Sequence, residues 1–152
     1  MAAGKNNQRA NADNADTRQQ LLRQVAALCY RQGEAGKEVL LITSRDTGRW
    51  IIPKGWPIIG KDAPQAAMQE AWEEAGVKSG RIKDKAVGTY RYEKNMPKGE
   101  DLQIETQVFA VKVGKLKSDY PEVAERRRKW VRSSKAANMV DEPELQKILR
   151  DI

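Results

Sequence analysis

Three glutamates, Glu70, Glu73 and Glu74, fall within one turn of a predicted helix that Gly76 ends. Their spacing places the carboxylates on one helical face, where like charges repel and the helix dipole is unfavourable. A solvated acidic face readily explains a pair of glutamates on a helix. It explains three of them less well at the C-terminal end, where negative charge is unfavourable. A hard divalent cation explains them all, because Mg²⁺ takes carboxylates together with water and substrate phosphates. With a further carboxylate to deprotonate a water, the cluster predicts metal-assisted hydrolysis of a phosphoanhydride.

The composition narrows the chemistry that accompanies this cluster. The 152 residues include no histidine, so the usual general base and commonest metal ligand are absent. Cys29 is the only cysteine, which excludes a disulfide within the chain and fits a reducing, cytoplasmic setting. Catalysis must therefore depend on carboxylates, tyrosines, lysines or a hard metal ion.

The charge balance predicts an anionic partner. The formal net charge is +7, which suits nucleic acid, polyphosphate or a phosphorylated small molecule, although solubility alone also explains it. No apolar run approaches the roughly 20 residues needed to span a bilayer, so no membrane partner is expected.

The elements that must position the carboxylates can be read along the chain. Short strands are predicted at 23–32, 37–45 and 50–53. The helix then begins at Asp62, with Pro64 in its first turn and Gln65 completing a capping box. Gly76 suits a left-handed cap. The packed face of the helix is predicted to comprise Ala63, Ala67, Met68, Ala71, Trp72 and Ala75.

Further strands are expected at 86–94 and 102–113, and a basic segment at 125–131 leads to a closing helix at 141–152. The centre of the longer strand, 108–111, is apolar on both faces, as in an interior strand. Residues 1–17 read as a disordered leader and 18–152 as one domain. The fold class predicted is α/β, with a mixed sheet and helices on its faces.

The stretch from Gly55 to Val77 resembles a Nudix box. Matching positions are Gly55, Glu70, Ala71, Glu73, Glu74, Gly76 and Val77. The resemblance implies an α/β/α sandwich that uses Mg²⁺ or Mn²⁺ to hydrolyse diphosphates linked to a further group. It implies that Glu70 and Glu74 are metal ligands, that Glu73 is the base or a further ligand, and that the backbone carbonyl near Lys54 or Gly55 adds a contact.

Two positions depart from the box. Lys61 stands where its first glutamate belongs, with Asp62 next to it, and Gln69 replaces an arginine that normally anchors the glutamates. Glutamine still donates a hydrogen bond but brings no charge. Activity is expected to persist, reduced or with altered metal dependence.

From about residue 24 to the C-terminus the chain resembles diphosphoinositol polyphosphate phosphohydrolases and their bacterial relatives, some of which also hydrolyse diadenosine polyphosphates. By that resemblance the phosphate contacts would be Arg23, Arg45, Lys54 and Arg128. Each is also explained as a solvated surface charge.

Other residues have open roles. Trp50 and Trp56 are expected to pack, with adenine stacking as the alternative. Glu105 is expected to be an outward-facing strand residue rather than an extra catalytic carboxylate.

Three functional hypotheses follow. The first is hydrolysis of a polyphosphorylated small molecule such as a diphosphoinositol polyphosphate, and the second is hydrolysis of diadenosine polyphosphates. The third is a module that binds polyphosphate or RNA without cleaving it, motivated by Lys61, Gln69 and the arginines at 126–128. Nucleic acid is the least favoured partner, and the oligomeric state stays open.

Overall fold

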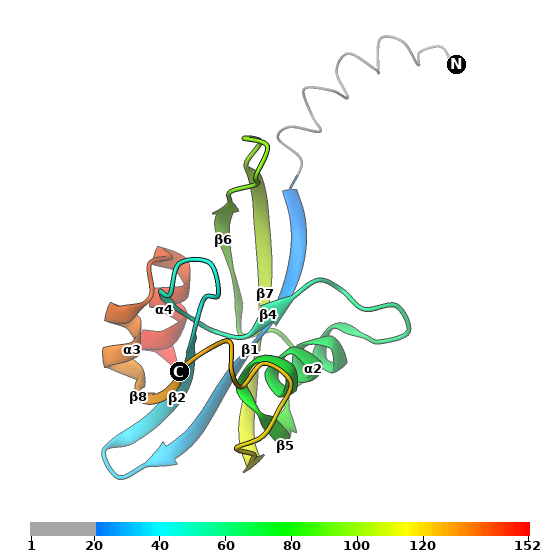
Figure 1. The fold of residues 1–152 in the computed structure, drawn as a ribbon. Helices are drawn as coiled ribbons and strands as arrows, with labels where there is room; N and C mark the ends of the chain where they lie inside the picture. The colour runs from blue at the N-terminus through cyan, green and yellow to red at the C-terminus, as the bar shows by residue number, and fades with distance from the viewer. Residues whose placement is uncertain (1–20) are drawn as a thin grey trace, which may run out of the picture.

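A mixed sheet lies at the centre of the computed structural model, which describes residues 21–152 (Figure 1). The leader expected at residues 1–17 lies outside the described residues. The main strand order is β3-β2-β1-β7-β5, while β4 pairs with β1, β6 with β7 and β8 with β2. The strands are β1 (Leu21–Gly33), β2 (Gly36–Thr43), β3 (Trp50–Ile51), β4 (Lys54–Gly55), β5 (Val77–Ile82), β6 (Gly88–Lys94), β7 (Leu102–Leu116) and β8 (Arg128–Arg132).

Strands β1 and β7 are the central pair. They run parallel from the pair Leu21 and Gln103 to the pair Tyr30 and Lys112. Residues 25–29 of β1 and 108–111 of β7 are buried without interruption, because helices cover both faces of the sheet here. The prediction that 108–111 is an interior strand segment is confirmed.

The helices lie on opposite faces of this sheet. Helix α2 (Ala63–Ala75) packs on one face, against a core that includes Cys29, Ile42 and Val111. Helices α3 (Ser133–Met139) and α4 (Pro143–Asp151) pack on the other, as Figure 1 shows. The fold is therefore an α/β sandwich with a mixed sheet, as predicted.

Local signals set both ends of α2. The Asp62 side chain accepts a hydrogen bond from the Gln65 backbone N–H at 2.9 Å, and the Gln65 side chain accepts one from the Asp62 N–H at 2.8 Å. Gly76 ends the helix at φ 77°, a left-handed conformation that glycine adopts without a steric penalty. The predicted capping box and C-cap are confirmed. Ala66, missing from the predicted packed face, is also buried.

Four elements were not predicted, and the first of them is β4, which follows the strand expected at 50–53. Strand β5 follows Gly76 directly. It pairs only with β7 and is mostly exposed, so its residues are mostly polar and do not show the apolar pattern of a buried strand. The basic segment at 125–131 was expected only as a connection, yet part of it forms β8 along β2, and α3 follows. In β8, Trp130 packs against the core beneath α2 and Val131 is buried in the core on the opposite face, while the residues on either side of them are charged.

Across residues 21–152, the helices are too short or too polar to span a bilayer.

Candidate active site

The end of helix α2 presents Glu70 and Glu74, one turn apart, to the short strand β4. An ideal Cβ built on Gly55 of β4 would lie only 2.4 Å from the carboxyl carbon of Glu70. A side chain larger than hydrogen at this position would displace the Glu70 carboxylate. The glycine at position 55 is therefore explained by the close approach of Glu70 to the backbone.

Glu70 and Glu74 share a hydrogen bond between their carboxyl groups. Burial, followed by this bond and the neighbouring negative charge, raises the pKa of Glu70 to about 8. Burial also raises the pKa of Glu74, opposed first by the positive charge of Arg126. The two groups therefore share a proton at neutral pH when nothing else neutralises them.

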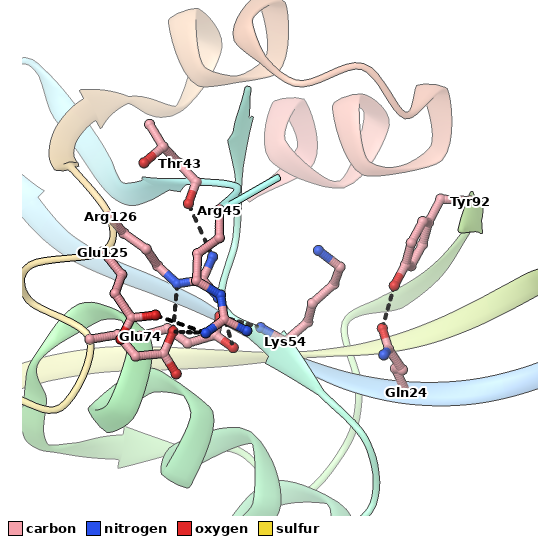
Figure 2. A network of polar contacts seen from close by, with 9 residues as sticks. Gln24, Thr43, Arg45, Lys54, Glu74, Tyr92, Glu125 and Arg126 are labelled. Carbon is pink, nitrogen blue, oxygen red and sulfur yellow. Dashed lines mark hydrogen bonds and ion pairs between the residues drawn. The ribbon is translucent and has the colours of Figure 1, made fainter. Parts of the chain in front are cut away.

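Glu74 is 6% exposed and is held from two sides (Figure 2). The backbone N–H of Lys54 donates to its Oε1 at 3.2 Å, and Arg126 Nη2 lies 3.6 Å from its Oε2. Arg126, whose side chain is 8% exposed, also donates to the Thr43 carbonyl at 3.0 Å and to Glu122 Oε1 at 2.8 Å. This arginine fixes the carboxylate and ties α2 to β2 and to the loop before β8.

Glu73 is oriented differently from its two neighbours. Its Oε2 accepts a hydrogen bond of 2.8 Å from Gln69 Nε2, four residues earlier on the helix. Its side chain does not line the cleft that Glu70 and Glu74 border. The structure thus brings two of the three predicted carboxylates together and places the third beside Gln69, the residue that departs from the box.

A cleft of about 640 Å³ opens above the carboxylate pair. Its volume lies within the ~300–1,000 Å³ of small-molecule sites. Its lining carries five cations, Arg45, Arg49, Lys54, Lys94 and Arg126, and five carboxylates, Asp46, Glu70, Glu74, Glu93 and Glu122. The cations can contact a multiply charged anion, while the carboxylates can hold a divalent cation beside it.

Lys54 lies in the middle of the cleft, between the glutamate–arginine group and the pair formed by Gln24 and Tyr92 (Figure 2). Burial lowers the pKa of its ammonium to about 8, and Nζ lies 5.1 Å from the centre of the Tyr92 ring. The Tyr92 hydroxyl donates to Gln24 Oε1. These contacts fix one side wall of the cleft.

The predicted phosphate contacts divide into two groups. Arg45 and Lys54 line the cleft. Arg23 does not; its side chain is 74% exposed and pairs with Glu105 at 3.5 Å. Arg128 is also outside the lining, because its Nη1 donates to the Ala75 carbonyl at 2.7 Å and its guanidinium lies over the Tyr120 ring.

Three cleft cations were not among the predicted contacts, Arg49, Lys94 and Arg126. Arg49 donates to Glu142 Oε2 at 2.7 Å, so a residue at the start of α4 holds it against the wall. Arg126 belongs to the same basic run as Arg128, and this run was the sequence feature that indicated an anion-binding residue in the segment. Which of its arginines faces the cleft depends on where β8 begins to pair with β2. The sequence of the run does not determine that position.

Glu105 and Trp50 lie outside the cleft lining, whereas Trp56 belongs to it. Glu105 of β7 pairs with Arg23 of β1 and with Arg91 of β6, and it does not line the cleft. Trp50 lies under the guanidinium of Arg127, whereas Trp56 is 43% exposed on the cleft wall.

The donors at the base of the cleft fit a hard divalent cation. They are two oxygen ligands that share a proton, which a cation would replace. Within residues 21–152, no three acidic, histidine or cysteine side chains gather into a metal cluster. A cation here would therefore take Glu70 and Glu74 and fill its other positions with backbone oxygen, water or substrate phosphate.

Comparisons with known proteins agree with this geometry. A family model described as the NUDIX domain matches residues 22–152. Diphosphoinositol polyphosphate phosphohydrolase 3-alpha of Mus musculus is 30% identical over 122 residues, which are 78% of this chain and 68% of that protein.

Solved structures show the same fold. A C. elegans Ap4A hydrolase, in a binary complex, aligns with a TM-score of 0.60 and 25% identity, covering 85% of this chain and 93% of that one. The E. coli dihydroneopterin triphosphate pyrophosphohydrolase aligns with a TM-score of 0.64 over 86% and 93% of the two chains, and at 18% identity the likeness shows the fold alone.

Proposed function

Because this chain belongs to the Nudix hydrolase family and so acts on phosphoanhydride substrates, we propose that it hydrolyses a polyphosphorylated small molecule, with a diphosphoinositol polyphosphate as the first candidate. The observation that carries the proposal is the Glu70–Glu74 pair, seated on Gly55 at the base of a cleft with five cations on its walls. A densely charged substrate suits this lining.

The metal proposed is Mg²⁺, or Mn²⁺ in its place, held by Glu70 and Glu74. When bound, the ion would neutralise phosphate charge and acidify a water. As the family resemblance implies, the backbone carbonyl of Gly55 would be a further ligand of this ion.

The remaining steps belong to this chain's own side chains. Lys54 and Arg126, which line the cleft beside Glu74, would orient the phosphates and stabilise the charge that develops on their oxygens. Arg45, which now pairs with Glu125 at 2.8 Å, would exchange that carboxylate for a phosphate oxygen. Arg23 and Arg128 have no such role in this arrangement.

The carboxylate that takes the proton of the attacking water must border the cleft. Glu70 does so, whereas Glu73 reaches it only after its bond to Gln69 opens. Because Glu70 is proposed here as a metal ligand, Glu73 is proposed as this base, as the family resemblance implies, once its bond to Gln69 opens. Gln69 then acts through Glu73, as a positioning residue.

A second substrate class is supported by one observation. Trp56 is 43% exposed on the cleft wall and Tyr92 lines the same cleft, so an adenine ring has aromatic surfaces to stack on. This favours diadenosine polyphosphates as the alternative substrate. An intracellular, cytoplasmic location would suit either class.

The test is release of phosphate and nucleotide from a panel of inositol pyrophosphates, diadenosine polyphosphates and nucleoside diphosphate derivatives. Each is incubated with Mg²⁺, with Mn²⁺ and with chelator. Turnover of inositol pyrophosphates that stops with chelator supports the first proposal, and turnover confined to the adenosine compounds replaces it with the second. Tight binding with no turnover on any compound would contradict both and leave a recognition module.

A further inference from the structure

A second cavity, of about 490 Å³, lies on the face of the sheet opposite helix α2. Its lining includes Leu28 and Tyr30 of β1, Ala110 of β7 and Ile148 of α4. Leu28 packs in the α3 and α4 core, whereas the active-site helix packs on the other face. The sheet therefore separates this cavity from the carboxylate pair.

The cavity has an apolar floor with one aromatic ring. Strand register pairs Leu28 with Ala110 and Tyr30 with Lys112, so neighbouring side chains of β1 and β7 point to the same side. Ile148 of α4 forms the opposite wall. Tyr30 is partly exposed, and Lys37 Nζ lies 5.3 Å from the centre of its ring.

A row of cations borders this floor. Lys83 lines the cavity and its backbone N–H donates to the Ala110 carbonyl, which puts it next to the apolar floor. Arg81, two residues earlier, pairs in register with Lys112, the strand partner of Tyr30, but neither of these two cations lines the cavity. Lys37 reaches the same ring from β2.

These cations lack anionic partners within the described part of the chain. The ion pairs formed by residues 21–152 involve other cations, and none includes Lys37, Arg81, Lys83 or Lys112. The two acidic residues of the lining are engaged: Asp151 pairs with Lys147 at 3.0 Å, and Glu144 accepts from the Arg91 N–H at 2.7 Å. Lys37 and Lys83 are thus the lining cations left for an external anion, and Glu144 is the lining carboxylate that no cation pairs with in residues 21–152.

We infer that this cavity binds a nucleoside monophosphate or a similar aromatic phosphate, at a site distinct from the catalytic cleft. The flat base would lie on the apolar floor beside Tyr30, and the phosphate would contact Lys37 and Lys83, which line the cavity. Two observations support this assignment. The cavity is large enough to hold a mononucleotide, and the cations beside its apolar floor favour a ligand that carries a negative charge. The inference does not rest on the proposed function.

The experiment is nuclear magnetic resonance titration of the full chain, in chelator, with AMP, adenosine and inorganic phosphate in separate series. Backbone amide signals distinguish the two sites: Lys83, Ala110 and Lys112 report the cavity, and Gly55 reports the cleft. AMP is expected to shift the cavity signals and to bind there at least about tenfold more tightly than adenosine or phosphate alone, because only AMP uses both floor and cations.

The decisive variant reverses charge at the rim. Lys37→Glu with Lys83→Glu should weaken AMP binding at the cavity about tenfold or more, because these two unpaired lysines line it. The matched control, Lys129→Glu with Lys135→Glu, changes two exposed lysines that line neither cavity and should leave AMP affinity within about twofold. Thermal unfolding confirms that all variants are folded.

Two results would overturn the inference. One is an AMP titration that leaves the cavity signals unshifted, or that shifts them equally in the rim variant and the control. The other is that a single-stranded RNA oligonucleotide shifts these signals while AMP does not, which would make the rim a nucleic-acid surface instead.

Discussion

At the scale of single residues, Gly55 and Glu70 depend on each other. A methyl group at position 55 would meet the Glu70 carboxyl carbon at 2.4 Å, and the flexible end of Glu70 would have to move. The alanine variant should therefore remain folded and lose activity, because a misplacement of about 1 Å costs turnover up to ~10²-fold.

The matched control for Gly55→Ala is Gly33→Ala. A Cβ at Gly33 would likewise displace a glutamate, Glu38, at 2.8 Å, but that glutamate pairs with Arg31 on the surface. Rates and denaturation midpoints of both variants are the measurement. Equal rates in the two variants would contradict the role given to Gly55.

The shared proton of Glu70 and Glu74 predicts how stability depends on pH in the metal-free protein. The pKa of Glu70 rises from 4.5 to about 8 on folding, and that of Glu74 rises too. Between these pH values the folded state binds more protons than the unfolded state, so stability is greatest below about pH 4.5 for these groups and falls as pH rises to about 8.

Glu70→Gln should flatten this decline, because glutamine carries no titrating proton. Denaturant midpoints measured across the pH range in chelator test it, with Glu38→Gln as the surface control. A decline of the same slope in wild type and Glu70→Gln would contradict the shared proton.

At the scale of elements, Arg126 joins three segments that are distant in sequence. It contacts Glu74 of α2, Thr43 of β2 and Glu122 of the loop before β8. Truncation to alanine would leave Glu74 and Glu122 without their buried cation, which costs about 3–5 kcal/mol in comparable pairs.

Arg126→Ala should therefore lower the unfolding free energy by about that amount and also reduce turnover. The neighbouring Arg127→Ala removes only an exposed guanidinium that lies over Trp50, worth under about 1 kcal/mol. Chemical denaturation compares them. Similar losses of stability in both variants would show that Arg126 does not join these elements.

The sequence was sufficient for α2 because its signals are local. The capping residues, the glycine end and the glutamate spacing all lie within fifteen residues or so of each other, and the structure has them as predicted. The i,i+4 spacing of Gln69 and Glu73 was a further local signal, and it accounts for the bond that orients Glu73 away from the cleft.

The choice among cations was not local. Arg126 faces the cleft and Arg128 caps the Ala75 carbonyl because β8 pairs with β2 from Arg128 onward. Strand register fixes which side chain faces which way, and a run of three arginines contains no feature that sets it. The cap also answers why α2 tolerates acids at its C-terminal end, since Arg128 and Arg126 supply positive charge there.

At the scale of the whole molecule, cations line both the cleft and the second cavity. The cleft combines five cations with five carboxylates, including the Glu70–Glu74 pair, whereas Lys37 and Lys83 line the second cavity beside an apolar floor. The formal net charge of +7 belongs to the whole sequence. The charge alone indicated an anionic partner but did not separate these surfaces.

The most direct test of the central claim is the turnover of Glu70→Gln and Glu74→Gln, each assayed on the best phosphoanhydride substrate with Mg²⁺, Mn²⁺ and chelator. Glu100→Gln, in an exposed loop, is the matched control. Both cleft variants should lose at least ~10²-fold, about 3 kcal/mol of transition-state stabilisation, while the control keeps the wild-type rate and chelator stops it. Full metal-dependent turnover in Glu70→Gln and Glu74→Gln would contradict the assignment of this pair as the catalytic metal site.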